Sequence, residues 1–155
     1  MKSLRPEKLK VVAIEPSEQG RYVLDDQAGF LMRVAMQRHT SIFMSRMIEG
    51  LTQTQFAALA KLYEVGPCSQ NYLGRLIYLD AATIKGVVDR LHLRGFVTAL
   101  NDPKDRRRRA VALTDHGRRV TEAAMLVAAE ITAATLSPLT AEERRQVAKL
   151  LRKLG

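Results

Sequence analysis

Residues 80–113 read "DAATIKGVVDRLHLRGFVTALNDPKDRRRRAVAL" and join two patterns without a linker. The first pattern is an amphipathic helix, for which Asp80 is a favourable N-cap and Gly95 a typical glycine just beyond the end. Its apolar face recurs at helical spacing in Ile84, Val87, Val88 and Leu91. In the second pattern, "FVTAL" (96–100) and "RAVAL" (109–113) predict two strands joined by a short loop. This helix, followed at once by a basic hairpin, decides the fold.

The remainder of the chain is predicted to be helical apart from an N-terminal arm. Helical patterns cover residues 25–48, 52–65, 69–79, 114–136 and 140–154. Thr52 and Gln55 fit a capping box at the start of the second helix. Residues 1–24 are expected to be irregular or extended, because Pro6, Pro16 and Gly20 interrupt them. Four helices, a hairpin and two more helices predict a mainly α protein with a small β-hairpin wing, a winged helix-turn-helix.

Positive charge is concentrated in the middle of the chain. The net charge is +9, and residues 66–119 carry 11 basic and five acidic side chains, or 11 − 5 = +6. Clustered lysines and arginines release counterions when they contact phosphates, so the pattern favours double-stranded DNA as a partner. A solvated basic loop without a partner is the alternative for the arginines that follow the Asp102-Pro103 turn.

Those arginines lie at the tip of the predicted hairpin. A narrow basic tip can enter the minor groove, where the electrostatic potential of DNA is most negative. Strand alternation predicts that Arg107 and Arg109 point one way and Arg106 and Arg108 the other. Asp105 is expected to hold one of the guanidinium groups in a fixed position.

The polar face of the helix over residues 80–94 has a small residue at its centre. Gly86 in a helix interior costs about 1 kcal/mol relative to Ala. In a helix laid into the major groove, Gly86 permits close approach while Thr83 and Lys85 reach bases or phosphates. A tolerated surface glycine is the alternative. The predicted DNA-binding residues are Ser69, Gln70, Thr83, Lys85, Arg90, Arg106, Arg107 and Arg108.

Two segments resemble the MarR (multiple antibiotic resistance regulator) family: "TIKGVVDRLHLRGFV" (83–97) and "DPKDRRRRAVALTDHG" (102–117). The family's wing pattern is met by Asp105, Arg107, Leu113 and Thr114, and its Asp-Arg-Leu by residues 89–91. The resemblance implies that Arg107 reaches the minor groove and that the helix with Thr83 and Lys85 reads the major groove. Gly86 departs from the family, many members of which carry Arg or another polar residue there.

The resemblance also implies a homodimer and a small-molecule effector. The chain is then one domain over residues 1–155, with a DNA-binding lobe over about 52–117 and dimerisation helices over about 1–48 and 118–155. An apolar stripe at spacings of four and three residues is typical of a helix seam: Val120, Ala124, Val127, Ile131 and Ala134. The same stripe could instead cover the chain's own core. Members of the family bind small aromatic acids between the first helices and the DNA-binding lobe.

Arg38 lies within an apolar stripe of the first helix, with His39 at the edge of that stripe. A cation on such a stripe requires a partner if it is buried. The partner is either a carboxylate across the dimer or an anionic effector, namely an aromatic acid or its acyl-coenzyme A thioester. Met36 and Phe43 add apolar surface nearby, so the predicted effector site is Arg38, His39, Met36 and Phe43.

Other chemistry finds little support in the sequence. Cys68 is the only cysteine, and no spacing of histidines, cysteines and carboxylates indicates a metal site. No catalytic motif, signal peptide or membrane span is found, so we expect a cytoplasmic regulator that is not an enzyme and has no cofactor. Two alternatives remain: a redox regulator acting through Cys68, whose position near a helix start could lower its pKa, and a winged-helix module for protein or RNA.

Overall fold

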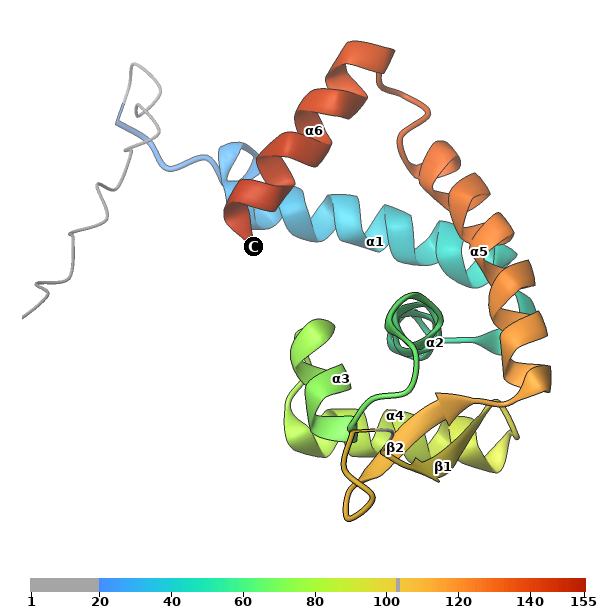
Figure 1. Cartoon of the computed structure of the whole chain (residues 1–155). Coiled ribbons are helices and arrows are strands. Elements are labelled where there is room, and N and C mark those ends of the chain that lie inside the picture. The colour runs from blue at the N-terminus through green and yellow to red at the C-terminus, as the bar shows by residue number, and fades with distance from the viewer. Residues whose placement is uncertain (1–19, 103) are drawn as a thin grey trace, which may run out of the picture. The chain divides into compact units, whose positions relative to one another are not determined.

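The computed structural model describes residues 20–102 and 104–155, and Figure 1 shows its elements. Of the arm predicted over residues 1–24, the first 19 residues lie outside the described part. The chain divides into two compact units, residues 1–36 and 37–155. The described part of the first unit holds the 3-10 turn η1 (Leu24–Asp26) and the beginning of α1 (Ala28–Arg46).

The first helix is shorter than the predicted range of 25–48. Asp25 and Asp26 belong to η1, and Gln27 has an extended backbone that separates η1 from α1. After α1 the chain enters a second 3-10 turn, η2 (Ile48–Gly50), in which Glu49 has a φ of 57°. The prediction of one uninterrupted helix was wrong at both ends, because side-chain periodicity does not report single-residue backbone breaks.

Three helices follow: α2 (Gln53–Val65), α3 (Gln70–Leu76) and α4 (Ala81–Leu93). The amide of Gln55 donates to the Thr52 hydroxyl and the amide of Thr52 to the Gln55 side chain, which confirms the capping box. Ser69 and Asp80 cap α3 and α4 through their side chains. Each cap satisfies an amide that the first helical turn leaves without a partner, and this fixes where the helix begins.

Helices α3 and α4 pack closely in the helix-turn-helix. A Cβ atom added at Gly74 would lie 3.0 Å from Ile84 Cγ2 and 3.1 Å from the Leu79 carbonyl oxygen. The predicted apolar face of α4 is confirmed, because its members are all buried: Ile84, Val87, Val88 and Leu91. Helix α3 ends at Leu76, three residues before the predicted end, and Tyr78 then adopts a φ of 59°.

The predicted hairpin is confirmed as strands β1 (Val97–Asn101) and β2 (Arg109–Leu113), which pair antiparallel. The first strand starts one residue later than predicted, because the Phe96 amide still donates to the Leu91 carbonyl of α4, at 3.0 Å. Cys68 extends the sheet: its amide donates to the Val111 carbonyl at 3.2 Å, and the Val111 amide donates to the Cys68 carbonyl at 2.8 Å. The chain before α3 is thereby fixed to the wing.

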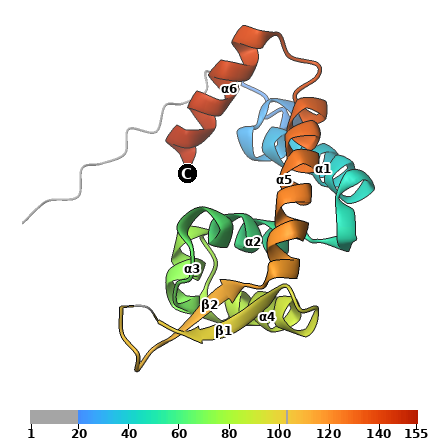
Figure 2. The ribbon, with the colours of Figure 1, turned by 45° about the vertical axis from the view of Figure 1, so that its right-hand side comes forward.

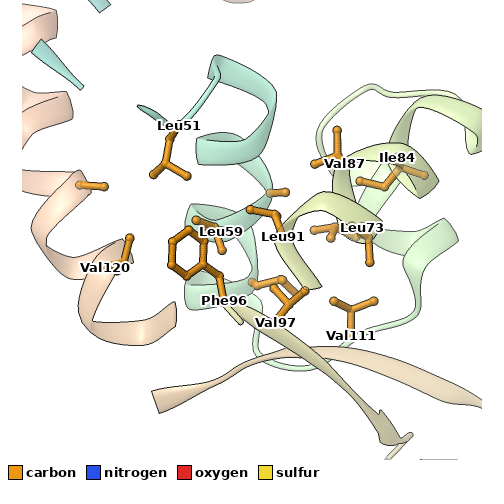
Figure 3. Packing of buried hydrophobic residues seen from close by; sticks show 14 of the residues in the cluster. Leu51, Leu59, Leu73, Ile84, Val87, Leu91, Phe96, Val97, Val111 and Val120 are labelled. Carbon is orange, nitrogen blue, oxygen red and sulfur yellow. The ribbon is translucent and has the colours of Figure 1, made fainter. Parts of the chain in front are cut away.

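A single apolar core joins the helices of this lobe to the wing. Figure 3 shows Leu59 of α2, Leu73 of α3 and Leu91 of α4 gathered above the wing residues Val97 and Val111. Leu59, Leu73 and Leu91 are fully buried. Burying side chains of this size contributes roughly 1.5–3 kcal/mol each, so the core holds α4 and the wing in a fixed relation.

Two helices complete the chain: α5 (Asp115–Thr135) and α6 (Ala141–Leu154). The apolar stripe of α5 packs into the chain's own core, where Val120, Ala124 and Ile131 are buried. Its interpretation as a dimer seam was therefore wrong. In α6 no residue is buried, and Leu150, Leu151 and Leu154 are each more than half exposed.

Among the residues that the structure describes, none of the helices combines the length and the apolar character needed to cross a membrane.

Candidate nucleic-acid interface

The exposed face of α4 carries the polar residues that the sequence singled out. Thr83, Lys85, Asp89 and Arg90 are all exposed. A Cβ atom added at Gly86 would meet only the Arg90 guanidinium, 3.5 Å away at its nearest nitrogen. Packing within the described chain therefore does not require a glycine at this position, which leaves the centre of the face open to close approach.

Two side chains on this face are held by neighbours on the same element. The amide and the hydroxyl of Thr83 donate to the Asp80 carboxylate at 2.7 and 3.0 Å, and these bonds lower the pKa of Asp80. The Lys85 ammonium lies 2.6 Å from the Asp89 carboxylate and is 65% exposed. An exposed pair of this kind is weak, so Lys85 can exchange Asp89 for a phosphate or a base.

The loop of the wing presents three exposed arginines. Arg106, Arg107 and Arg108 lie in the turn between the strands, so strand alternation does not apply to them and that prediction was wrong. Asp105 organises the turn: its carboxylate accepts the Arg107 amide at 3.0 Å and lies 3.7 Å from the Arg108 guanidinium. The predicted contact of Asp105 with an arginine is thereby confirmed, and Arg107 projects from a defined backbone.

A basic groove of about 430 Å³ lies between α3 and the wing loop. Ser69 and Tyr72 line it from α3 and its cap, together with three cations, Arg75, Lys104 and Arg108. Ser69 and Arg108 were predicted from the sequence, whereas Arg75 and Lys104 were not. The charge count over residues 66–119 included both, but only the fold brings them to one groove.

The wing loop and the beginning of α4 lie at the same end of the lobe in two views (Figures 1 and 2). Gln70 occupies the first turn of α3, next to Ser69. Six of the predicted DNA-binding residues thus come from the starts of α3 and α4 or from the wing loop, and Lys85 and Arg90 follow on α4. The arrangement offers one helix face and one basic loop to a polyanion.

The predicted effector residues have different surroundings. His39 and Phe43 line a pocket of about 230 Å³ between α1, α2 and α5, together with residues that the sequence analysis missed: Gln53, Phe56, Ala128 and Thr132. Phe43 and Phe56 pack with ring centroids 6.3 Å apart. Met36 belongs to the other unit and is 55% exposed.

Arg38 and His39 both contact the end of α5. The Arg38 guanidinium donates to the Ala134 carbonyl at 3.0 Å, and His39 Nδ1 lies 2.9 Å from the Thr135 hydroxyl. The cation expected to need a partner therefore contacts the negative end of a helix while remaining exposed.

Cys68 does not have the surroundings of a reactive thiol. Its side chain is 8% exposed, and burial, followed by the negative charge of Asp102, raises the pKa of the thiol. A thiol is reactive as its thiolate, so the suggestion of a lowered pKa was wrong. Across residues 20–102 and 104–155, histidine, cysteine and carboxylate side chains form no cluster suited to a metal ion.

Comparison with known proteins agrees with this geometry. The MarR family model matches residues 51–108, which span α2, α3, α4, β1 and the wing loop. The HTH-type transcriptional repressor NicR of Pseudomonas putida is 39% identical over 140 residues, covering 90% of this chain and 89% of NicR. The chain belongs to the MarR family of transcriptional regulators. This confirms the resemblance, the winged-helix fold class and the assignment to a class of regulators, not enzymes.

Solved structures of MarR-type regulators have the same fold. A probable transcriptional regulator from Pseudomonas aeruginosa superposes with a TM-score of 0.82 at 48% identity, covering 86% of this chain and 100% of that one. BpsR of Bordetella bronchiseptica, whose DNA binding is regulated by 6-hydroxynicotinic acid, superposes with a TM-score of 0.81 at 38% identity. That match covers 87% of this chain and 97% of BpsR.

Proposed function

We propose that this MarR-family regulator is a homodimeric repressor that leaves a pseudo-palindromic operator when a small aromatic acid binds. The observation that carries the DNA-binding part is the exposed face of α4 beside a wing loop with three exposed arginines. Helix α4 enters the major groove and Arg107 the neighbouring minor groove. The name of NicR supports a repressor.

The proposed dimer uses apolar surface that the described chain leaves exposed. Leu150, Leu151 and Leu154 recur on one face of α6, and each is at least 55% exposed. Contiguous apolar surface of this kind is typical of a protein interface. A second copy related by a two-fold axis would place two α4 helices on half-sites about one helical turn apart. Residues 1–155 then act as one MarR-type domain.

The proposed effector site is the pocket lined by His39 and Phe43. Its volume of about 230 Å³ lies below the roughly 300–1,000 Å³ of pockets for drug-sized ligands. A single-ring acid therefore suits it better than an acyl-coenzyme A thioester. Phe43 and Phe56 supply apolar contacts and His39 supplies an imidazole nitrogen for hydrogen bonding. The exposed Arg38, which is next to His39 in α1, supplies the positive charge for a carboxylate. Regulation of BpsR by 6-hydroxynicotinic acid supports this class of ligand.

The DNA-binding part is tested by selecting duplexes from a random library with the full chain, followed by footprinting. Two protected half-sites about one turn apart are expected. Lys85→Ala should weaken DNA binding. If Lys85 contacts a base, the variant should also lose about 1–3 kcal/mol of discrimination between bases at that position. Lys61→Ala removes a charge from α2, where Lys61 pairs with Glu64, and serves as the control. Failure to recover any preferred duplex would contradict the proposal.

The effector part is tested by titration calorimetry with 6-hydroxynicotinic acid, benzoate and benzoyl-coenzyme A. A one-ring acid should bind and release the selected duplex, which requires that it prefer the DNA-incompetent state. Arg38→Ala should raise the concentration needed for release and leave DNA affinity nearly unchanged. Arg46→Ala, at the last residue of α1, is the control. If Arg38→Ala and the parent bind the ligand with equal affinity, Arg38 does not contact the effector and has only its structural contact with α5.

A further inference from the structure

The turn between α3 and α4 holds a tyrosine in an unfavourable backbone conformation. Tyr78 has a φ of 59°, in the left-handed region that side chains with a Cβ atom rarely adopt. Among the described residues, positive φ occurs at Gly20, Gly50, Gly66 and Gly95, and otherwise only at Glu49 and Tyr78. Glycine would occupy position 78 without strain.

Glu49 and Tyr78 differ in what surrounds them. Arg94 donates to the Glu49 carbonyl at 2.5 Å and lies 3.6 Å from its carboxylate, so the chain itself supports that strained residue. The side chain of Tyr78 is 89% exposed, and its hydroxyl and ring have no partner within residues 20–102 and 104–155. The described chain therefore gives no reason for a tyrosine at this position.

The position of Tyr78 suggests what its partner is. It lies two residues before Asp80, the cap of α4, and its amide donates to the carbonyl of Arg75, which lines the basic groove. The turn and the wing loop lie at the same end of the lobe (Figures 1 and 2). When α4 occupies the major groove, a residue just before α4 lies at the edge of that groove, beside the phosphates.

We propose that the hydroxyl of Tyr78 donates a hydrogen bond to a DNA phosphate and thereby positions α4 in the groove. This inference rests on the proposed DNA-binding function. Tyrosine is among the side chains that contact phosphates without reading sequence. Because the phenol is neutral, its contact adds affinity but releases no counterion, so the salt dependence of binding stays that of the cationic residues.

The test measures the affinity of full-length variants for a selected 30-base-pair duplex by fluorescence anisotropy, together with thermal unfolding. Tyr78→Phe keeps the ring and the backbone conformation but removes the donor. Its affinity should fall about tenfold, with the melting temperature and the slope of affinity against salt unchanged. Tyr78→Gly should lose affinity similarly without a lower melting temperature. Tyr22→Phe, at another exposed tyrosine, should bind as the parent does.

Each other outcome overturns the inference in a recognisable way. If Tyr78→Phe binds DNA as the parent does while Arg107→Ala binds weakly, the proposed contact of Tyr78 is wrong and the proposed function still holds. A large drop in the melting temperature of Tyr78→Gly assigns Tyr78 a role in folding. A reduced salt slope in Tyr78→Phe shows that the loss acts through cationic residues. If the parent binds no duplex, both the inference and the proposed function fail.

Discussion

Gly86 lies at the centre of the α4 face that we assign to DNA, and its surroundings in the chain are open. An added methyl group would meet only the flexible end of Arg90 at 3.5 Å. Glycine in a helix interior is unfavourable, so its presence here is better explained by what approaches α4 from outside.

Replacing Gly86 with alanine should therefore separate stability from binding. Gly86→Ala should increase the free energy of unfolding by about 0.5–1 kcal/mol, because alanine has the higher helix propensity. The same methyl group should weaken DNA binding by obstructing close approach. Chemical denaturation and anisotropy measure the two effects. Tighter DNA binding in Gly86→Ala would show that the glycine is only tolerated.

Cys68 should be dispensable for regulation. It is buried, its pKa is raised, and its backbone bonds to Val111 do not depend on the thiol. Cys68→Ser should keep DNA binding and its relief by the effector, and peroxide should not release DNA from the parent. Release by peroxide that disappears in Cys68→Ser would establish the redox alternative.

The starts of α2, α3 and α4 follow from the sequence, whereas the end of α3 does not. Thr52, Ser69 and Asp80 each place a helix start through one side-chain bond, and residue type predicts such bonds. The end of α3 depends on Tyr78, whose left-handed backbone contradicts its residue type. For the same reason the break at Glu49 could not be predicted, since glycine is what normally indicates positive φ.

Gly117, near the start of α5, differs from Gly86 of α4 because it lies against the backbone of another segment. A Cβ atom added at Gly117 would lie 1.9 Å from the Phe96 carbonyl oxygen, a backbone atom that cannot move aside. Gly117→Ala should lower the free energy of unfolding by about 3 kcal/mol or more, as overpacking does when relief requires backbone shifts. Thermal unfolding of the variant and the parent measures this loss of stability. A melting temperature equal to that of the parent would contradict the close contact between α5 and the wing.

At the scale of the whole molecule, α6 stands out because none of its residues is buried within the described chain. Its exposed leucines should bury on dimerisation, so Leu151→Asp should give a monomer in analytical ultracentrifugation and the parent a dimer. Leu93→Asp, at an exposed leucine of α4, should remain dimeric. A dimeric Leu151→Asp protein would place the interface elsewhere.

The pocket that we propose for the effector illustrates what the sequence alone does not supply. Arg38, His39 and Phe43 were predicted from the sequence because a cation lies among apolar residues of one helix. Gln53, Phe56 and Thr132 come from α2 and α5, and only the packing of three helices brings them to the pocket. The apolar stripe of α5 was ambiguous for a similar reason. The same spacing of apolar residues is expected for a helix that packs against its own core and for one that packs against a second copy.

The most direct test of the account is the affinity of Arg107→Ala for the selected duplex at physiological salt. Arg107 is an exposed residue of the wing loop, so its loss should leave the melting temperature unchanged. We expect affinity to fall at least tenfold and the slope of log affinity against log salt to decrease by about 0.9, the contribution of one phosphate contact. Arg145→Ala removes the same charge from α6 and should bind as the parent does. Affinity and slope equal to those of the parent in Arg107→Ala would contradict the assignment of the wing to DNA.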